Sequence, residues 1–251
     1  MGGMLSLTGE RGGGPVKPGL PVADLTSGLW VAIAILSMLA GRAQSGRGAY
    51  VDFSMIDGQV SLLTLAAARY FALGEVPARL GTEHPGRVPS ATFRCGDGAF
   101  VHITASDQHW LPLCKVLGIE EWGKASVFAD NSSRVRNREI VMAGLSAAIA
   151  IRPRDALCAA CDAMGVPAGP IKAVDEVLAD PHTLARAMVA SFDHPRIGAF
   201  PFLAMPFKLD GWENPVGSYP PVLGEHTDRV LTERLGYSSE RIAALREAKA
   251  I

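Results

Sequence analysis

The feature that most constrains this chain is the apolar run Leu29–Ala40 near its start, which carries no charged residue. A run of about a dozen residues is shorter than the ~20 that a helix needs to cross a bilayer. Polar residues that favour a helix start precede the run, and no small-residue signal-peptide cleavage site follows it. The sequence therefore predicts a buried helix that ends near Gln44, in a protein that does not bind a membrane.

Asp24 lies just before this helix and has two interpretations. Followed by Leu25, Thr26 and Ser27, it is a candidate N-cap. A carboxylate at a helix N-terminus also feels the positive end of the helix dipole, which keeps it ionised as a nucleophilic carboxylate must be. Nearby free N–H groups could stabilise charge that develops on an attacked carbonyl. Residue types alone favour the cap.

The rest of the chain alternates helical and strand-like patterns, which indicates an α/β fold. Residues 49–54 alternate as in a half-buried strand, and residues 56–70 carry apolar side chains at helical spacing. The segment 74–90 is rich in Gly and Pro and predicts a linker or a functional loop. Beyond it we expect a hairpin of strands 91–94 and 100–104, helices at 107–117, 133–150, 153–164 and 174–187 (interrupted at Asp180–Pro181), strands at 187–193 and 202–208, and two terminal helices.

Charge and cysteine content exclude several classes of protein. The formal net charge of the 251-residue chain is −1, which does not favour a nucleic-acid partner. The local basic cluster of Arg134, Arg136 and Arg138 is interpreted as a solvated helix face. Four cysteines are too few for a disulfide scaffold. Cys158 and Cys161 form a CxxC within a predicted helix and are interpreted as buried small hydrophobic side chains, so a reducing cytoplasm is the expected compartment.

Histidine spacing gives no metal signature. The six histidines contain no HxH or HExxH pattern, so we predict no metal site. His84 lies in the Gly/Pro-rich loop and is the one histidine with a candidate role, because loops carry function more often than strands do. A plain surface histidine is the alternative. The sequence has no GxSxG, so a hydrolase serine elbow is not supported.

Eight short motifs follow one another along nearly the whole chain. They are Gly3–Gly9, Pro21–Gly28, Ser45–Gly48, Val51–Met55, Asp57, Gly165–Pro170, Asp180–Pro181 and Leu223–Thr227. This ordered set resembles the family III CoA-transferases, the group that holds formyl-CoA and carnitine CoA-transferases. No single motif is decisive, and the order carries the resemblance.

The resemblance implies a mechanism and a set of site residues. The aspartate that matches Asp24 would attack an acyl-CoA thioester, form a mixed anhydride and then an aspartyl-CoA thioester, and pass CoA to a carboxylic acid. Coenzyme A would be part of the substrate, with no permanently bound cofactor. Loop 81–90 would lie near the active site and shield the anhydride from water, with Gly81, His84 and Pro85 as substrate-binding or CoA-binding residues.

The resemblance also implies an architecture. Residues 1–80 would be a remnant of a large nucleotide-fold-like domain that holds the catalytic aspartate and the long buried helix. Residues 81–186 would form a small α+β domain, and residues 187–251 would return to the large domain. Family members carry a further segment before this point and form interlocked dimers. We therefore expect a homodimer or a missing N-terminal subunit, and weak or no activity from the chain alone.

Two alternative functions remain open from the sequence. In the α-methylacyl-CoA racemase branch of the same superfamily, the matching aspartate is a general base, and a glycine run tends to follow it. Here Leu25, Thr26 and Ser27 follow Asp24 instead, which favours the transferase. The other alternative is a non-catalytic fragment, or one subunit of a split enzyme that acts through association.

Overall fold

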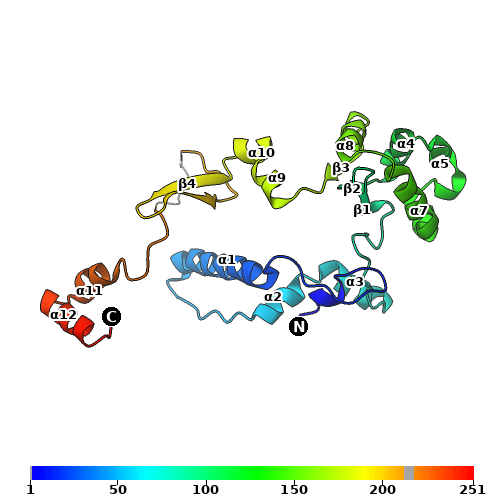
Figure 1. Cartoon of the computed structure of the whole chain (residues 1–251). Coiled ribbons are helices and arrows are strands. Elements are labelled where there is room, and N and C mark those ends of the chain that lie inside the picture. The colour runs from blue at the N-terminus through cyan, green and yellow to red at the C-terminus, as the bar shows by residue number, and fades with distance from the viewer. Residues whose placement is uncertain (1, 212–217) are drawn as a thin grey trace. The chain divides into compact units, whose positions relative to one another are not determined.

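The computed structural model describes residues 2–211 and 218–251, and its chain divides into two units, Met1–Ile171 and Lys172–Ile251 (Figure 1). Each unit has its own helices and its own antiparallel sheet. The expected domain segments 1–80, 81–186 and 187–251 stay predictions. Met1 and residues 212–217 of the third segment lie outside the described part.

The first long element is helix α1, Val22–Ser45, which follows the short 3-10 helix η1, Met4–Ser6. Helix α1 ends at Gly46, whose left-handed φ of 67° lets its N–H donate to the carbonyl of Arg42 at 2.9 Å. The predicted end near Gln44 is confirmed. The prediction that Asp24 is the N-cap is wrong, because Pro21 takes that position and Asp24 lies within the first turn. Proline is tolerated at a helix start, because the N–H that it lacks would have no intrahelical partner there.

Helix α1 is not buried within the described chain, contrary to the prediction. It contains no buried residue, and the Leu29 and Leu36 side chains are 66% and 65% exposed. A helix that is apolar on all sides needs cover on all sides, and among the described elements the short helix α2, Met55–Ser61, is the one that packs most against it. By length and composition alone α1 could also cross a membrane, but a single helix of this kind is a weak indication.

The chain between α1 and the Gly/Pro-rich loop differs from the sequence prediction in two ways. Residues 49–54 form no strand, and Tyr50 is 93% exposed. A strand is stable only when a neighbour satisfies its backbone N–H and C=O groups, and no neighbour pairs with this segment. The helix predicted at 56–70 is two helices, α2 and α3, and α3 spans Thr64–Leu73. Ser54 caps α2 by accepting a hydrogen bond from the backbone N–H of Ile56.

The sheet of the first unit has three antiparallel strands, in the order β1, β2, β3. The predicted hairpin is confirmed as β1, Ser90–Arg94, paired with β2, Phe100–Thr104. Strand β3, Ala168–Pro170, pairs with the other edge of β2. Its three residues include Gly and Pro, and therefore gave no strand signal.

Helices pack around this sheet and complete the core of the first unit. They are α4 (Asp107–Val116), α5 (Glu120–Lys124), the 3-10 helix η2 (Ser126–Phe128), α6 (Asn131–Arg136), α7 (Arg138–Ile149) and α8 (Arg154–Ala163). Val101, Ile103, Leu113 and Leu145 are fully buried in the core that these elements share. The helix predicted at 133–150 breaks at Asn137, which ends α6 and begins α7.

The CxxC cysteines are packing side chains on α8, as the sequence predicted. Cys161 is fully buried and Cys158 is half-buried, and both are free thiols. Burial raises the pKa of the Cys161 thiol to about 11. A thiol with a raised pKa holds little reactive thiolate near neutral pH.

The second unit consists of short elements. They are α9 (Val174–Leu178), α10 (Pro181–Ala185), β4 (Val189–His194), β5 (Gly198–Leu203), α11 (Thr227–Leu235) and α12 (Ser239–Glu247). The predicted interruption at Asp180–Pro181 is confirmed, and the Asp180 carboxylate caps α10 by accepting from the N–H of His182. Strands β4 and β5 pair antiparallel, and β5 begins earlier in the chain than the predicted strand 202–208.

Shortening a core side chain on α7 should destabilise the first unit. Leu145→Ala leaves a cavity in the core, and we expect it to lower the free energy of unfolding by about 2–5 kcal/mol. Ile140→Ala on the same helix is the matched control. Its side chain is 59% exposed, and we expect a change within about 0.5 kcal/mol. Urea unfolding followed by the fluorescence of the core residues Trp110 and Trp122 measures both; equal effects would contradict this packing.

Candidate functional site

Asp24 occupies the first turn of α1 as an exposed carboxylate. The N-cap Pro21 makes no side-chain capping bond, so the helix begins without the usual acceptor for its first N–H groups. The carboxylate and the positive end of the helix dipole therefore share one exposed surface. A helix N-terminus of this kind favours a negatively charged group beside it, because free N–H groups and the positive end of the dipole face the same side.

Two hydroxyls next to Asp24 are turned back onto the helix. Thr26 Oγ1 donates to the carbonyl of Val22 at 2.7 Å, and Ser27 Oγ donates to the carbonyl of Ala23 at 2.6 Å. Thr26 Oγ1 also accepts from Nε2 of the buried Gln59 on α2 at 3.1 Å. The bond from Gln59 ties the start of α1 to α2, while the other two bonds lie within the first turns of α1.

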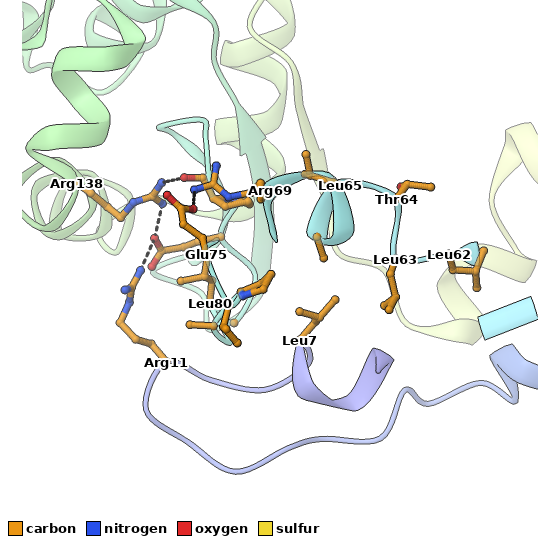
Figure 2. Close-up of a pocket in the computed structure, with 17 residues that line it drawn as sticks. Leu7, Arg11, Leu62, Leu63, Thr64, Leu65, Arg69, Glu75, Leu80 and Arg138 are labelled. Atoms are coloured by element: carbon orange, nitrogen blue, oxygen red, sulfur yellow. Dashed lines mark hydrogen bonds and ion pairs between the residues drawn. The ribbon is translucent and has the colours of Figure 1, made fainter. Parts of the chain in front are cut away.

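A pocket of about 450 Å³ lies between the first turn of the chain, α3 and the loop that follows α3 (Figure 2). Leucines form much of its wall, and Figure 2 shows Leu62 and Leu63 toward one end with Arg11 and Arg138 toward the other. An apolar wall with a few charged groups at one end is the usual composition of a small-molecule site. Gly81 and Pro85 line it; Asp24 and His84 are not among its lining residues.

The charged end of the pocket is organised around two glutamates. Glu83 accepts from Arg138 Nη1 at 2.8 Å and from Arg11 Nη2 at 3.4 Å. Glu75 pairs with Arg69 of α3. Three guanidinium groups are thus shared between two carboxylates, which leaves this end with one excess positive charge.

The interpretation of the arginine cluster on α6 and α7 as a solvated face is correct only for Arg136. Arg134 is fully buried, and the Arg138 side chain is 15% exposed. Both reach the loop that precedes β1, whose residues lie far away in the sequence. A spacing of alternate residues cannot show which of them face that loop, so sequence reasoning missed Arg134 and Arg138.

Gly81 lies where the loop meets the N-terminal turn. Its φ is 60°, in the left-handed region that favours glycine, and its N–H donates to the carbonyl of Gly9 at 2.9 Å. A Cβ at this position would lie 2.8 Å from Glu10 Oε2. The exposed Glu10 side chain can move away from such a Cβ, so the left-handed backbone is what disfavours any other residue at this position.

His84 is exposed, and its ring is held by its own loop. Nδ1 accepts a hydrogen bond from the backbone N–H of Gly86 at 3.0 Å. Partial burial lowers the pKa of His84, and the positive charges of Arg87, Arg138 and Arg69 lower it further. The imidazole is therefore neutral near pH 7. A neutral ring whose Nδ1 accepts must carry its proton on Nε2.

Within residues 2–211 and 218–251, no group of three or more His, Cys, Asp or Glu side chains could hold a metal ion. The candidate site consists of two separate parts of the first unit. One is the Asp24 carboxylate on α1, and the other is loop 81–90 with the pocket beside it. The structure brings Gly81 and Pro85 together at that pocket and places Asp24 on a separate element.

Comparison with known proteins gives one consistent result. The family model described as CoA-transferase family III matches residues 1–227. Succinyl-CoA:glutarate CoA-transferase of Mus musculus is 30% identical over 245 residues, which are 98% of this chain and 56% of that protein. An acyl-CoA transferase of Fusarium pseudograminearum is 34% identical over 98% of this chain and 54% of its own length.

Comparison with solved structures points to the same group of proteins. A CAIB/BAIF family protein from Brucella suis is 36% identical, with a TM-score of 0.77, over 92% of this chain and 60% of that one. The chain thus spans little more than half the length of the proteins that it matches.

A side chain at position 81 should strain the junction between the loop and the N-terminal turn. Gly81→Ala forces a Cβ into the left-handed region, and we expect a loss of about 1–2 kcal/mol of unfolding free energy in urea titration. Gly86→Ala is the control in the same loop. Its added Cβ meets the His84 ring at 3.8 Å, an ordinary contact, and a loss as large as that of Gly81→Ala would contradict the assignment.

Proposed function

Because this chain belongs to CoA-transferase family III, we propose that it takes part in moving CoA from an acyl-CoA thioester to a carboxylic acid, with Asp24 as the nucleophile. The observation that carries the proposal is the exposed carboxylate of Asp24 in an uncapped first helical turn. Relatives named for succinyl-CoA with glutarate or mesaconate support small carboxylic acids as the class of donor and acceptor.

The proposed reaction proceeds by exchange at three carbonyl groups, those of the donor, of Asp24 and of the acceptor. A carboxylate oxygen of Asp24 attacks the thioester carbonyl, the C–S bond breaks, and CoA leaves as a thiolate from a mixed anhydride. The thiolate attacks the aspartyl carbonyl of that anhydride and releases the donor acid, which leaves an aspartyl-CoA thioester. The acceptor carboxylate attacks this thioester to form a second anhydride and free thiolate. The thiolate then attacks the acceptor's carbonyl, which yields the new acyl-CoA and restores Asp24.

The start of α1 suits this chemistry electrostatically. Each attack by a carboxylate places a new negative charge on an oxygen close to the helix terminus. N–H groups that lack an intrahelical acceptor are donors for that charge, and the dipole favours it. The covalent route conserves the thioester energy, since a free carboxylate acceptor is a poor direct nucleophile and the exchange is divided into easier steps.

Water is the competing nucleophile in this mechanism, and the loop is the proposed shield. An anhydride hydrolyses readily, so the site must exclude water while the anhydride exists. Loop 81–90, with Gly81, His84 and Pro85, is proposed to cover the reacting groups and contact the substrate or CoA. We propose that a homodimer partner or a second chain completes the CoA site, and that the reaction takes place in the cytoplasm.

Replacing the nucleophile should abolish transfer without loss of folding. With the protein purified together with any chain that accompanies it, we expect Asp24→Asn to lower the transfer rate at least about a thousandfold. Asp175→Asn is the matched control, since Asp175 is an exposed carboxylate in the first turn of α9. We expect its rate to stay within about twofold. The measurement is acceptor-dependent formation of a new acyl-CoA.

Two results would contradict the proposal. Transfer by Asp24→Asn at the parent rate would exclude Asp24 as the nucleophile. Exchange of the substrate α-proton with solvent deuterium in the absence of any acceptor acid would instead support the racemase chemistry, in which the aspartate is a base.

A further inference from the structure

Three side chains from α6 and the start of α7 hold the backbone of the loop that precedes β1. Asn131, Arg134 and Arg138 recur at spacings of three and four residues, which places them along one side of this helical segment. Asn131 Nδ2 donates to the carbonyl of Gly86 at 2.9 Å, and its Oδ1 accepts from the N–H of Val88 at 3.1 Å. Arg134 Nε donates to the carbonyl of Val88 at 2.7 Å.

Arg138 makes the largest number of these contacts. Its Nη2 donates to the carbonyls of His84 at 3.0 Å and of Pro85 at 2.8 Å, while its Nη1 donates to Glu83 Oε2. One planar guanidinium thus fixes three consecutive residues, which a compact ammonium group could not do in the same way. The contact is largely shielded, because the side chains of Arg138 and Glu83 are 15% and 22% exposed.

The loop fixed in this way determines how His84 is presented. The backbone of His84 is held at its carbonyl by Arg138 and at its N–H by the carbonyl of Ser90, at 2.9 Å. The ring is held at Nδ1 by the N–H of Gly86, and the carbonyl of Gly86 is in turn bound by Asn131. The ring atom that remains for another molecule is Nε2, which carries the proton.

We propose that Arg138 is a positioning residue that holds loop 83–86 so that His84 presents its Nε2–H as a fixed hydrogen-bond donor to a carbonyl oxygen of the substrate. The donor role rests on the proposed function. A donor aimed in advance at an oxygen that gains negative charge stabilises the transition state without reorganisation. The thioester and anhydride carbonyls of CoA transfer are oxygens of this kind.

Partial burial, and then the charges around the ring, keep it in the donor form. Arg87 of the loop, Arg138 of α7 and Arg69 of α3 disfavour a protonated imidazole. The one carboxylate beside it in sequence, Glu83, is engaged by Arg138 and Arg11. Protonation of Nδ1 would also cost the hydrogen bond from Gly86. Because the folded protein binds a proton at His84 less readily than the unfolded chain does, this arrangement is stable at neutral pH and weakens as the pH falls below about 6.5.

Imidazole NMR on the ¹⁵N-labelled chain tests the positioning directly, and needs no enzymatic activity. His84→Gln identifies the His84 signals. In the parent chain we expect the Nε2–H tautomer at pH 8 and a titration below the ordinary histidine pKa. In Arg138→Gln we expect that pKa to rise toward its ordinary value, and the amide proton of Gly86 to exchange about tenfold faster or more.

Two further variants separate the effect of the Arg138 guanidinium geometry from that of its charge, and from a non-specific effect of replacing an arginine in this helical segment. Arg138→Lys keeps the positive charge but loses the guanidinium fork, so Gly86 should exchange faster while the His84 pKa moves less than in Arg138→Gln. Arg136→Gln is the control, because Arg136 is exposed and donates to Ser133 Oγ rather than to the loop. It should leave both observables at the parent values. A parent chain in the Nδ1–H tautomer, or a Gly86 exchange rate indifferent to Arg138→Gln, would overturn the positioning role.

The donor role has its own test in the transfer assay. We expect His84→Ala to lower kcat about tenfold to a hundredfold with little change in KM for the acyl-CoA. A parent-like kcat would overturn the donor role even if Asp24→Asn is inactive. If the protein purified together with any chain that accompanies it transfers no CoA at all, the proposed function and the donor role are overturned together. The NMR results would still decide whether Arg138 positions the loop.

Discussion

The buried guanidinium of Arg134 is the contact on which the position of the loop before β1 depends, because it ties that loop to the helices around the first unit's core. It donates to the carbonyl of Val88 in the loop, to the carbonyl of Phe128 in η2 at 3.0 Å and to the carboxylate of Asp107 in α4 at 2.7 Å. A fully buried charge is tolerated only when its hydrogen-bonding capacity is used. The loop, η2 and α4 must therefore all be in place for this charge to be satisfied.

The contacts of Arg134 and Arg138 with the loop determine where the candidate site residue His84 lies. Arg134 fixes the end of the loop, Arg138 fixes its middle, and the ring of His84 is set by the backbone that they hold. The same loop forms part of the pocket wall through Gly81 and Pro85. Asp24 lies on a different element. It is a candidate nucleophile because it lies at the uncapped start of α1. The proposed reaction needs both pieces, since one supplies the attacking oxygen and the other a donor and a cover.

Features that depend on neighbouring residues could be predicted from the sequence. The end of α1 at Gly46, the hairpin between β1 and β2, and the interruption at Asp180–Pro181 each follow from the conformational preferences of a few adjacent residues. Features that depend on distant segments could not. Among the described residues, the segment 49–54 has the alternation of a strand but pairs with no strand. Helix α1 has the composition of a buried helix, and α2 is the described element that packs most against it. Arg134 and Arg138 lie 46 and 53 residues from the loop carbonyls that they bind, so no local pattern reveals their burial.

The central claim is that the Asp24 carboxylate becomes covalently acylated, and trapping tests it most directly. Hydroxylamine added during incubation with an acyl-CoA should intercept the anhydride or the aspartyl-CoA thioester and leave a hydroxamate on the enzyme. Peptide mapping by mass spectrometry should then find this modification at Asp24, only when acyl-CoA is present. A protein that turns over acyl-CoA with its Asp24 peptide unmodified, or with the hydroxamate on another carboxylate, would contradict the account.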